Sequence, residues 1–209
     1  MDSLLRRERA SLCATLEAGG PDAPTLCAGW SARQLAAHLV LREGHPAAAG
    51  MVVRPLSRWT KHTLDSLATT EFGRLVHRVA TGPPRWSPVR LPGVEQAVNT
   101  VEFFVHHEDL RRAFPSWTPR VFAEPDEQEL WRLLQRRARV LLRHSPVGVE
   151  LATPSADRFV AHQGGSSVTL TGLPSELALY LHGRQAHSLV ELTGPADGTT
   201  QFETLTLRI

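Results

Sequence analysis

Three titratable side chains lie on the apolar face of a predicted helix. Residues 94–114 have helical periodicity, and at about 100° per residue Glu102, His106 and Asp109 fall within about 60° of one another. Apolar residues flank this arc on both sides, so the three side chains are expected to be buried. Burying an ionisable group without a partner costs of the order of several kcal/mol. A metal ion is one partner that would hold a carboxylate ionised and an imidazole neutral at the same place.

A histidine in a second helix shows the same anomaly. The segment 31–43 also has helical periodicity, and His38 lies among its leucines. Two histidines and one carboxylate, His38, Glu102 and His106, match an open catalytic zinc site with water in the fourth position. Ni²⁺, Co²⁺ or Fe²⁺ would also accept these donors. Two metal-free interpretations remain open: a helix-surface ion pair beside a satisfied core histidine, or a buried trio that is merely hydrogen-bonded.

The elements that must position these donors are mostly helical. Ser31 and Gln34 form a capping-box pattern at the start of the helix that carries His38. Glycine and proline interrupt the apolar periodicity often enough to define the helix ends. The predicted helices of this region span residues 3–17, 31–43, 56–79, 94–114 and 125–144.

After Pro146 the apolar period changes from helical to alternating. Alternation at 147–151, at 168–170 and, less regularly, at 202–207 predicts strands, and residues 174–182 predict a short helix. The fold class is therefore predicted to be α+β. A four-helix bundle over residues 1–120 precedes a small α+β domain over 121–209. The seam is expected near 115–125, with Ser145-Pro146 as the alternative.

Composition excludes several classes of protein. The 209 residues carry 23 basic and 21 acidic side chains, without the dense basic stripe of a nucleic-acid binder. No apolar run approaches the ~20 residues of a membrane span, and the N-terminus has no signal-peptide pattern. Two cysteines, Cys13 and Cys27, cannot build a disulfide framework and fit a reducing compartment. We expect a cytoplasmic protein, a monomer or small homo-oligomer, that binds a small molecule.

Three segments resemble a known family. Residues 25–40 (TLCAGWSARQLAAHLV) and 99–112 (NTVEFFVHHEDLRR) look like the two signatures of the mycothiol-dependent maleylpyruvate isomerase family. That family is a branch of the DinB-like metal-binding four-helix bundles. Residues 176–184 (ELALYLHGR) resemble a helix of its C-terminal domain. The resemblance covers nearly the whole chain and is closest to an uncharacterised metal-binding subfamily. Gln34 departs from the pattern, since many members have Asp there.

The resemblance implies roles for particular residues. It places metal ligands at His38, Glu102 and His106, the trio found from helical spacing. It also suggests that Arg184 approaches the metal cleft and binds an anionic substrate; the alternative is a surface charge at a helix end. Asp109 is interpreted as a partner of a ligand imidazole, or else of Arg112.

The implied cosubstrate is a low-molecular-weight thiol such as mycothiol. A thiolate that adds to an activated double bond, allows rotation and leaves again performs cis–trans isomerisation; if the adduct is retained, the reaction is S-transfer. The sequence does not choose between an isomerase and a transferase. A non-catalytic metal- and small-molecule-binding module is the alternative function. Cys13 and Cys27 are interpreted as small core residues, with a thiol role for Cys27 as the alternative.

Overall fold

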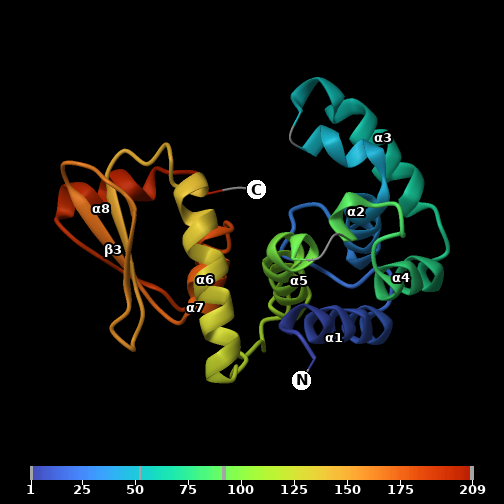
Figure 1. Ribbon diagram of the computed structural model, residues 1–209, viewed down its shortest axis with the longest axis horizontal. Coiled ribbons are helices and arrows are strands. Elements are labelled where there is room, and N and C mark those ends of the chain that lie inside the picture. Colours follow the sequence, from blue (N-terminus) through green and yellow to red (C-terminus); the bar gives the residue numbers. More distant parts are fainter. Residues whose placement is uncertain (1, 52, 91–92, 208–209) are drawn as a thin grey trace. The chain divides into compact units, whose positions relative to one another are not determined.

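The computed structural model describes residues 2–51, 53–90 and 93–207. It divides the chain into two compact units, Met1–Pro119 and Arg120–Ile209 (Figure 1). The first unit is helical and the second contains a small mixed sheet, so the predicted α+β class is confirmed. In the part of the chain that the structure describes, no helix is both long and apolar enough to cross a bilayer.

The described part of the first unit has five α-helices, and four of them, α1, α2, α4 and α5, share one apolar core. α1 packs against α4 and α5, and α2 packs against α4 and α3. Short 3-10 turns at Pro46–Met51, Arg54–Leu56 and Pro88–Arg90 connect the longer elements. The α-helices of this unit are α1 (Leu4–Gly19), α2 (Ala32–Gly44), α3 (Ser57–Ala68), α4 (Phe72–Thr81) and α5 (Val94–Arg111).

The prediction of a single helix over residues 56–79 is wrong, because two helices, α3 and α4, occupy this segment. The side chain of Glu71 accepts hydrogen bonds from the backbone N–H groups of Gly73 and Arg74 and so caps a new helix. The capping box expected at α2 does form, with the Ser31 backbone N–H donating to Gln34 Oε1 at 2.9 Å. Gln34 therefore supports this helix start, as the sequence predicts.

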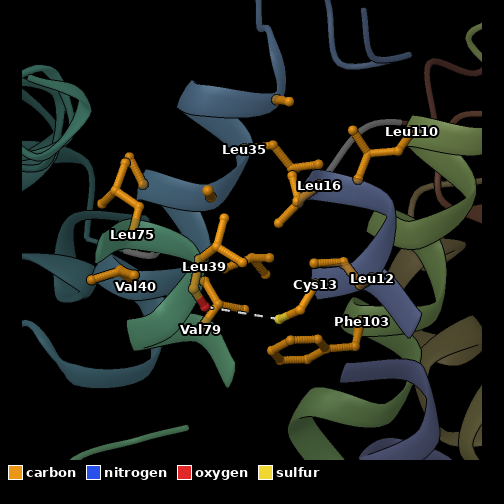
Figure 2. Packing of buried hydrophobic residues seen from close by; sticks show 14 of the residues in the cluster. Leu12, Cys13, Leu16, Leu35, Leu39, Val40, Leu75, Val79, Phe103 and Leu110 are labelled. Atoms are coloured by element: carbon orange, nitrogen blue, oxygen red, sulfur yellow. Dashed lines mark hydrogen bonds between the residues drawn. The ribbon is translucent and has the colours of Figure 1, made fainter. Parts of the chain in front are cut away.

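The bundle core consists of apolar side chains from α1, α2, α4 and α5. Figure 2 shows Leu12, Cys13 and Leu16 of α1 among the side chains of the other three helices. Cys13 is fully inside this cluster, as expected of a small core residue. The core fixes the facing surfaces of α2 and α5, and these two helices carry the predicted donors. Other members of the cluster include Leu35, Leu39, Val40, Leu75, Val79, Phe103 and Leu110.

The second unit begins with α6 (Glu124–Leu141), and its last helix overlaps the start of the strand expected over residues 202–207. Its sheet has the order β2-β1-β3-β4, in which β1 and β3 are parallel and the outer pairs are antiparallel. The alternation at 202–207 wrongly predicted a strand, because α8 continues to Glu203 and buries Phe202. The remaining elements are β1 (Gly148–Ala152), β2 (Arg158–His162), β3 (Ser167–Thr171), α7 (Pro174–Leu181), a 3-10 turn (Gln185–His187), β4 (Glu191–Thr193) and α8 (Ala196–Glu203).

Candidate metal centre

The three predicted donors converge between α2 and α5. Glu102 Oε1 lies 3.3 Å from His38 Nε2 and 3.1 Å from His106 Nε2. One potential ligand atom from each residue lies within 4.8 Å of the other two, as a shared metal ion requires. The spacing of four residues places Glu102 and His106 on successive turns of α5, and α2 supplies His38 from the facing helix.

The protonation states of the centre are strongly coupled. Burial alone would raise the pKa of Glu102, but hydrogen bonds from His106 and His38 hold it well below its usual range. Burial likewise opposes protonation of His106, yet its bonds to Asp109 and Glu102 raise the pKa of His106 well above its usual value. Burial lowers the pKa of His38. The two carboxylates thus favour the protonated form of the His106 imidazole, and a metal ion at Nε2 would compete with a proton there.

Asp109 controls which ring nitrogen of His106 faces Glu102. Its Oδ2 lies 2.9 Å from His106 Nδ1, and its side chain is completely buried. A carboxylate at Nδ1 leaves Nε2 for the centre, which is the arrangement that orients metal-ligating histidines in proteins. The predicted partnership with a ligand imidazole is thus present geometrically. Arg112, the alternative partner, places its Nε 2.5 Å from Glu108 Oε2.

A second group of donors shares His106, and it includes Cys27, for which the sequence gave a thiol role only as the alternative. Cys27 Sγ lies 3.1 Å from Asp109 Oδ2 and 3.9 Å from His106 Nδ1. Together these three residues form another cluster with metal-ligand chemistry. Cys27 was expected in the core, but it is half-buried and lies outside the helices, in the loop between α1 and α2. The only sequence signal was its position a few residues before the helix that carries His38.

Arg42 also lies at the candidate centre, and helical spacing on α2 could have revealed it. It follows His38 by one turn of α2, and its Nε lies 3.1 Å from Glu102 Oε1. The guanidinium also donates to Asn99 Oδ1 and, at 3.1 Å, to the Val98 carbonyl. Arg42 thus provides a fixed positive charge beside the carboxylate and contributes to its lowered pKa.

A chain of buried polar groups continues from Arg42 to α1. Asn99 donates through Nδ2 to Glu43 Oε1 at 2.7 Å. Glu43 in turn forms a two-pronged ion pair with Arg9, at 2.6 and 2.7 Å. The candidate centre is therefore linked by hydrogen bonds to three helices of the bundle.

The residues present fit a divalent metal that prefers nitrogen and oxygen donors. His38 and His106 could each supply Nε2, Glu102 could supply a carboxylate oxygen, and Asp109 already fixes the second nitrogen of His106. This donor set is that of catalytic zinc sites and is also compatible with nickel, cobalt or iron. The ring of Trp30 packs against that of His38 with centroids 5.1 Å apart, which restricts the imidazole from the loop side.

Arg184, the predicted substrate-binding residue, belongs to the second unit. It follows α7, and its Nη1 donates to the carbonyl of His182. Its participation in a site with His38 and His106 stays a prediction.

Comparison with solved structures identifies proteins of the same fold. The mycothiol-dependent maleylpyruvate isomerase matches with 15% sequence identity over 92% of each chain and a TM-score of 0.57. A histidine-to-alanine variant of that enzyme matches with 16% identity, the same coverage and a TM-score of 0.62. The predicted resemblance is thus confirmed for the fold. No protein-family model matches the chain, and no curated protein matches it significantly.

Proposed function

We propose that the chain is a metal-dependent enzyme that uses a low-molecular-weight thiol of the mycothiol type to isomerise, or to transfer sulfur onto, a small electrophilic substrate. The observation that carries this proposal is the convergence of His38, Glu102 and His106 in a buried cluster. The fold shared with a mycothiol-dependent isomerase supports the choice of cosubstrate.

The chain's own residues would have distinct roles in this chemistry. His38, Glu102 and His106 would hold a divalent metal, and Asp109 would keep the His106 ring oriented through Nδ1. A zinc ion with an open position lowers the pKa of a bound thiol, so that sulfur is available as thiolate at neutral pH. A free thiol, with a pKa of about 8.5, is mostly protonated there. Arg184 would bind a carboxylate of the substrate through its guanidinium fork.

The reaction that suits a thiolate and a conjugated cis double bond conserves all atoms. Sulfur forms a bond to one alkene carbon, and the π electrons move onto the conjugated carbonyl. Rotation about the new single bond follows; the electrons then return, the carbon–sulfur bond breaks, and the thiolate leaves from the trans isomer. If the adduct instead takes up a proton on carbon, the product is a thioether and the same steps amount to S-transfer.

Metal analysis of variants tests the ligand assignment. Protein purified without chelator is expected to carry about one divalent ion, and His38→Ala, Glu102→Gln and His106→Ala should each lose most of it. His62→Ala, at an exposed histidine of α3, is the matched control and should keep the wild-type content. Wild-type metal content in both ligand-histidine variants would refute the site.

Thiol binding and turnover test the activity. Calorimetric titration of the metal-loaded protein with mycothiol should show binding that is lost in His106→Ala, and maleylpyruvate should lose its cis-alkene absorbance only when thiol is present. No binding at millimolar mycothiol would remove the thiol from the proposal. Binding without turnover or thioether formation would instead favour the non-catalytic metal- and small-molecule-binding module.

The proposal places the enzyme in the cytoplasm, since a thiol-dependent reaction and two free cysteines suit a reducing compartment. A monomer or a small homo-oligomer is expected by size-exclusion chromatography with light scattering.

A further inference from the structure

The loop between α1 and α2 is fastened to the end of α5 beside the candidate centre. The backbone N–H of Leu26 donates to the Asp109 carbonyl at 3.0 Å. The Thr25 hydroxyl accepts from the Cys27 N–H at 3.1 Å and donates to the Trp30 carbonyl at 2.8 Å. These bonds fix the backbone on both sides of Cys27. The thiol is therefore held at a defined place rather than carried on a free loop.

This placement directs the Cys27 thiol at the carboxylate that orients His106. Sγ lies 3.1 Å from Asp109 Oδ2, and the same oxygen lies 2.9 Å from His106 Nδ1. Asp109 is completely buried, so each donor that reaches it offsets part of the cost of removing its charge from water. One carboxylate oxygen thus accepts from a thiol on one side and from an imidazole on the other.

We propose that Cys27 is a positioning residue of the metal centre, which acts on His106 through Asp109. The thiol donates to the carboxylate and holds it in the rotamer that keeps the proton on His106 Nδ1. Nε2 then points at Glu102, 3.1 Å away. This inference rests on the proposed metal site. It assigns to the loop a role at both histidines, because Trp30 of the same loop packs against His38.

The same geometry admits a competing role that the experiment must separate. Cys27, His106 and Asp109 are themselves a possible metal-binding cluster, so the thiol could be a ligand instead of a donor to Asp109. A ligand is a thiolate bonded to the metal, and bonded to cobalt it gives an intense charge-transfer band in the near ultraviolet. A positioning thiol gives none.

Cobalt titration of cysteine variants tests the proposal. Co²⁺ is added to metal-free wild type, Cys27→Ala, Cys27→Ser and Cys13→Ala, and affinity is read from the cobalt absorption bands. Cys27→Ala should weaken Co²⁺ binding about tenfold, the lower end of the range for lost outer partners of ligands. Cys27→Ser keeps a donor and should stay within about threefold of wild type. Cys13→Ala, a core thiol 3.9 Å from the Val76 carbonyl, should leave the affinity unchanged (Figure 2).

Three results would overturn the proposal. Wild-type affinity in Cys27→Ala would show that the thiol does not act on His106. Failure of Cys27→Ser to restore binding would show that side-chain volume, and not donation, is what matters. A sulfur-to-cobalt charge-transfer band present in wild type and absent in Cys27→Ser would make Cys27 a ligand.

A measurement without metal separates this inference from the proposed function. If wild type and Cys13→Ala bind no cobalt, it is the metal site that fails. The ¹⁵N resonances of the His106 ring in the metal-free protein then decide the positioning role. They should show a proton at Nδ1 in wild type and shift in Cys27→Ala but not in Cys13→Ala. Unchanged His106 resonances in a folded Cys27→Ala variant would refute the inference whatever the metal result.

Discussion

Replacement of Glu43 by alanine should destabilise the helical bundle more than any single surface change. Both oxygens of Glu43 face the Arg9 guanidinium, at 2.6 and 2.7 Å, and the two residues are only 3% and 8% exposed. Burial raises the pKa of Glu43, while the bonds from Arg9 oppose that shift. Removal of one partner leaves the other charge buried without its counter-ion.

The size of the loss in stability depends on which polar contacts the remaining member of the pair keeps. Loss of one member of a buried ion pair costs about 3–5 kcal/mol. In Glu43→Ala, Arg9 still donates to the Val79 carbonyl and lies 3.0 Å from Glu95, so the lower end, about 3 kcal/mol, applies. In Arg9→Ala, Glu43 keeps the amide of Asn99 as its side-chain donor, and about 4–5 kcal/mol is expected. For a chain of this length the corresponding fall in Tm is about 6–20 °C.

Urea and thermal unfolding, followed by circular dichroism, measure these differences. The double variant Arg9→Met, Glu43→Leu should recover much of the loss, because apolar residues of similar volume can replace a buried pair without penalty. Lys61→Ala breaks an exposed ion pair of α3 and should change stability by less than about 0.5 kcal/mol. Single variants at Arg9 and Glu43 that cost no more than this control would refute the argument.

Three further outcomes are expected. Glu127→Ala leaves the backbone N–H and hydroxyl of Ser175 without their acceptor at the start of α7, and urea unfolding should show a loss of about 1–3 kcal/mol; an equal loss in Glu127→Gln would contradict this. In metal-free protein, burial lowers the pKa of His106, but its hydrogen bonds outweigh burial and raise this pKa well above 6.5. Protonated His106 therefore stabilises the fold fully below pH 6.5, and this stabilisation is lost as the pH rises through the pKa of the folded state. Urea midpoints measured with chelator should fall over that rise in pH in wild type and not in His106→Gln. Ala156→Gly should raise stability by about 0.5–1 kcal/mol in thermal unfolding, because Ala156 has φ = 70°; a lower Tm would contradict this strain.

Most helices of the bundle could be predicted because their ends carry recognisable signals. The capping box at Ser31 and the glycine and proline after α1 and α2 gave boundaries within a few residues of those observed. The break between α3 and α4 could not be predicted. Its cap is Glu71, whereas N-caps are usually Ser, Thr, Asp or Asn, and apolar residues continue on both sides.

The C-terminal error has a different physical origin. α8 contains glycine and two threonines, which are poor helix formers, and Leu205 and Leu207 follow Phe202 at irregular spacing beyond the helix. Packing nevertheless stabilises the helix. Phe202 and Gly198 are buried, and Gly198 allows α8 to approach Ser166 and Val168 closely. Tertiary contact overrode propensity here. β2 was not predicted for a different reason, since its five residues show no clear alternation of apolar and polar side chains.

The candidate centre divides in the same way between local and long-range information. His38, Glu102 and His106 could be found from the sequence because each lies on a helix, where spacing alone tells which face a side chain shares. Cys27 reaches Asp109 across 82 positions, and no periodicity connects a loop to a helix that far away. Helical spacing therefore finds the donors and partners on the same helices, such as Asp109, but not the groups that a loop contributes. A sequence scan for two histidines and a glutamate would not distinguish this centre from one that lacks those groups. Residues such as Cys27 are consequently where proteins with the same donor trio are expected to differ in metal affinity and in reaction.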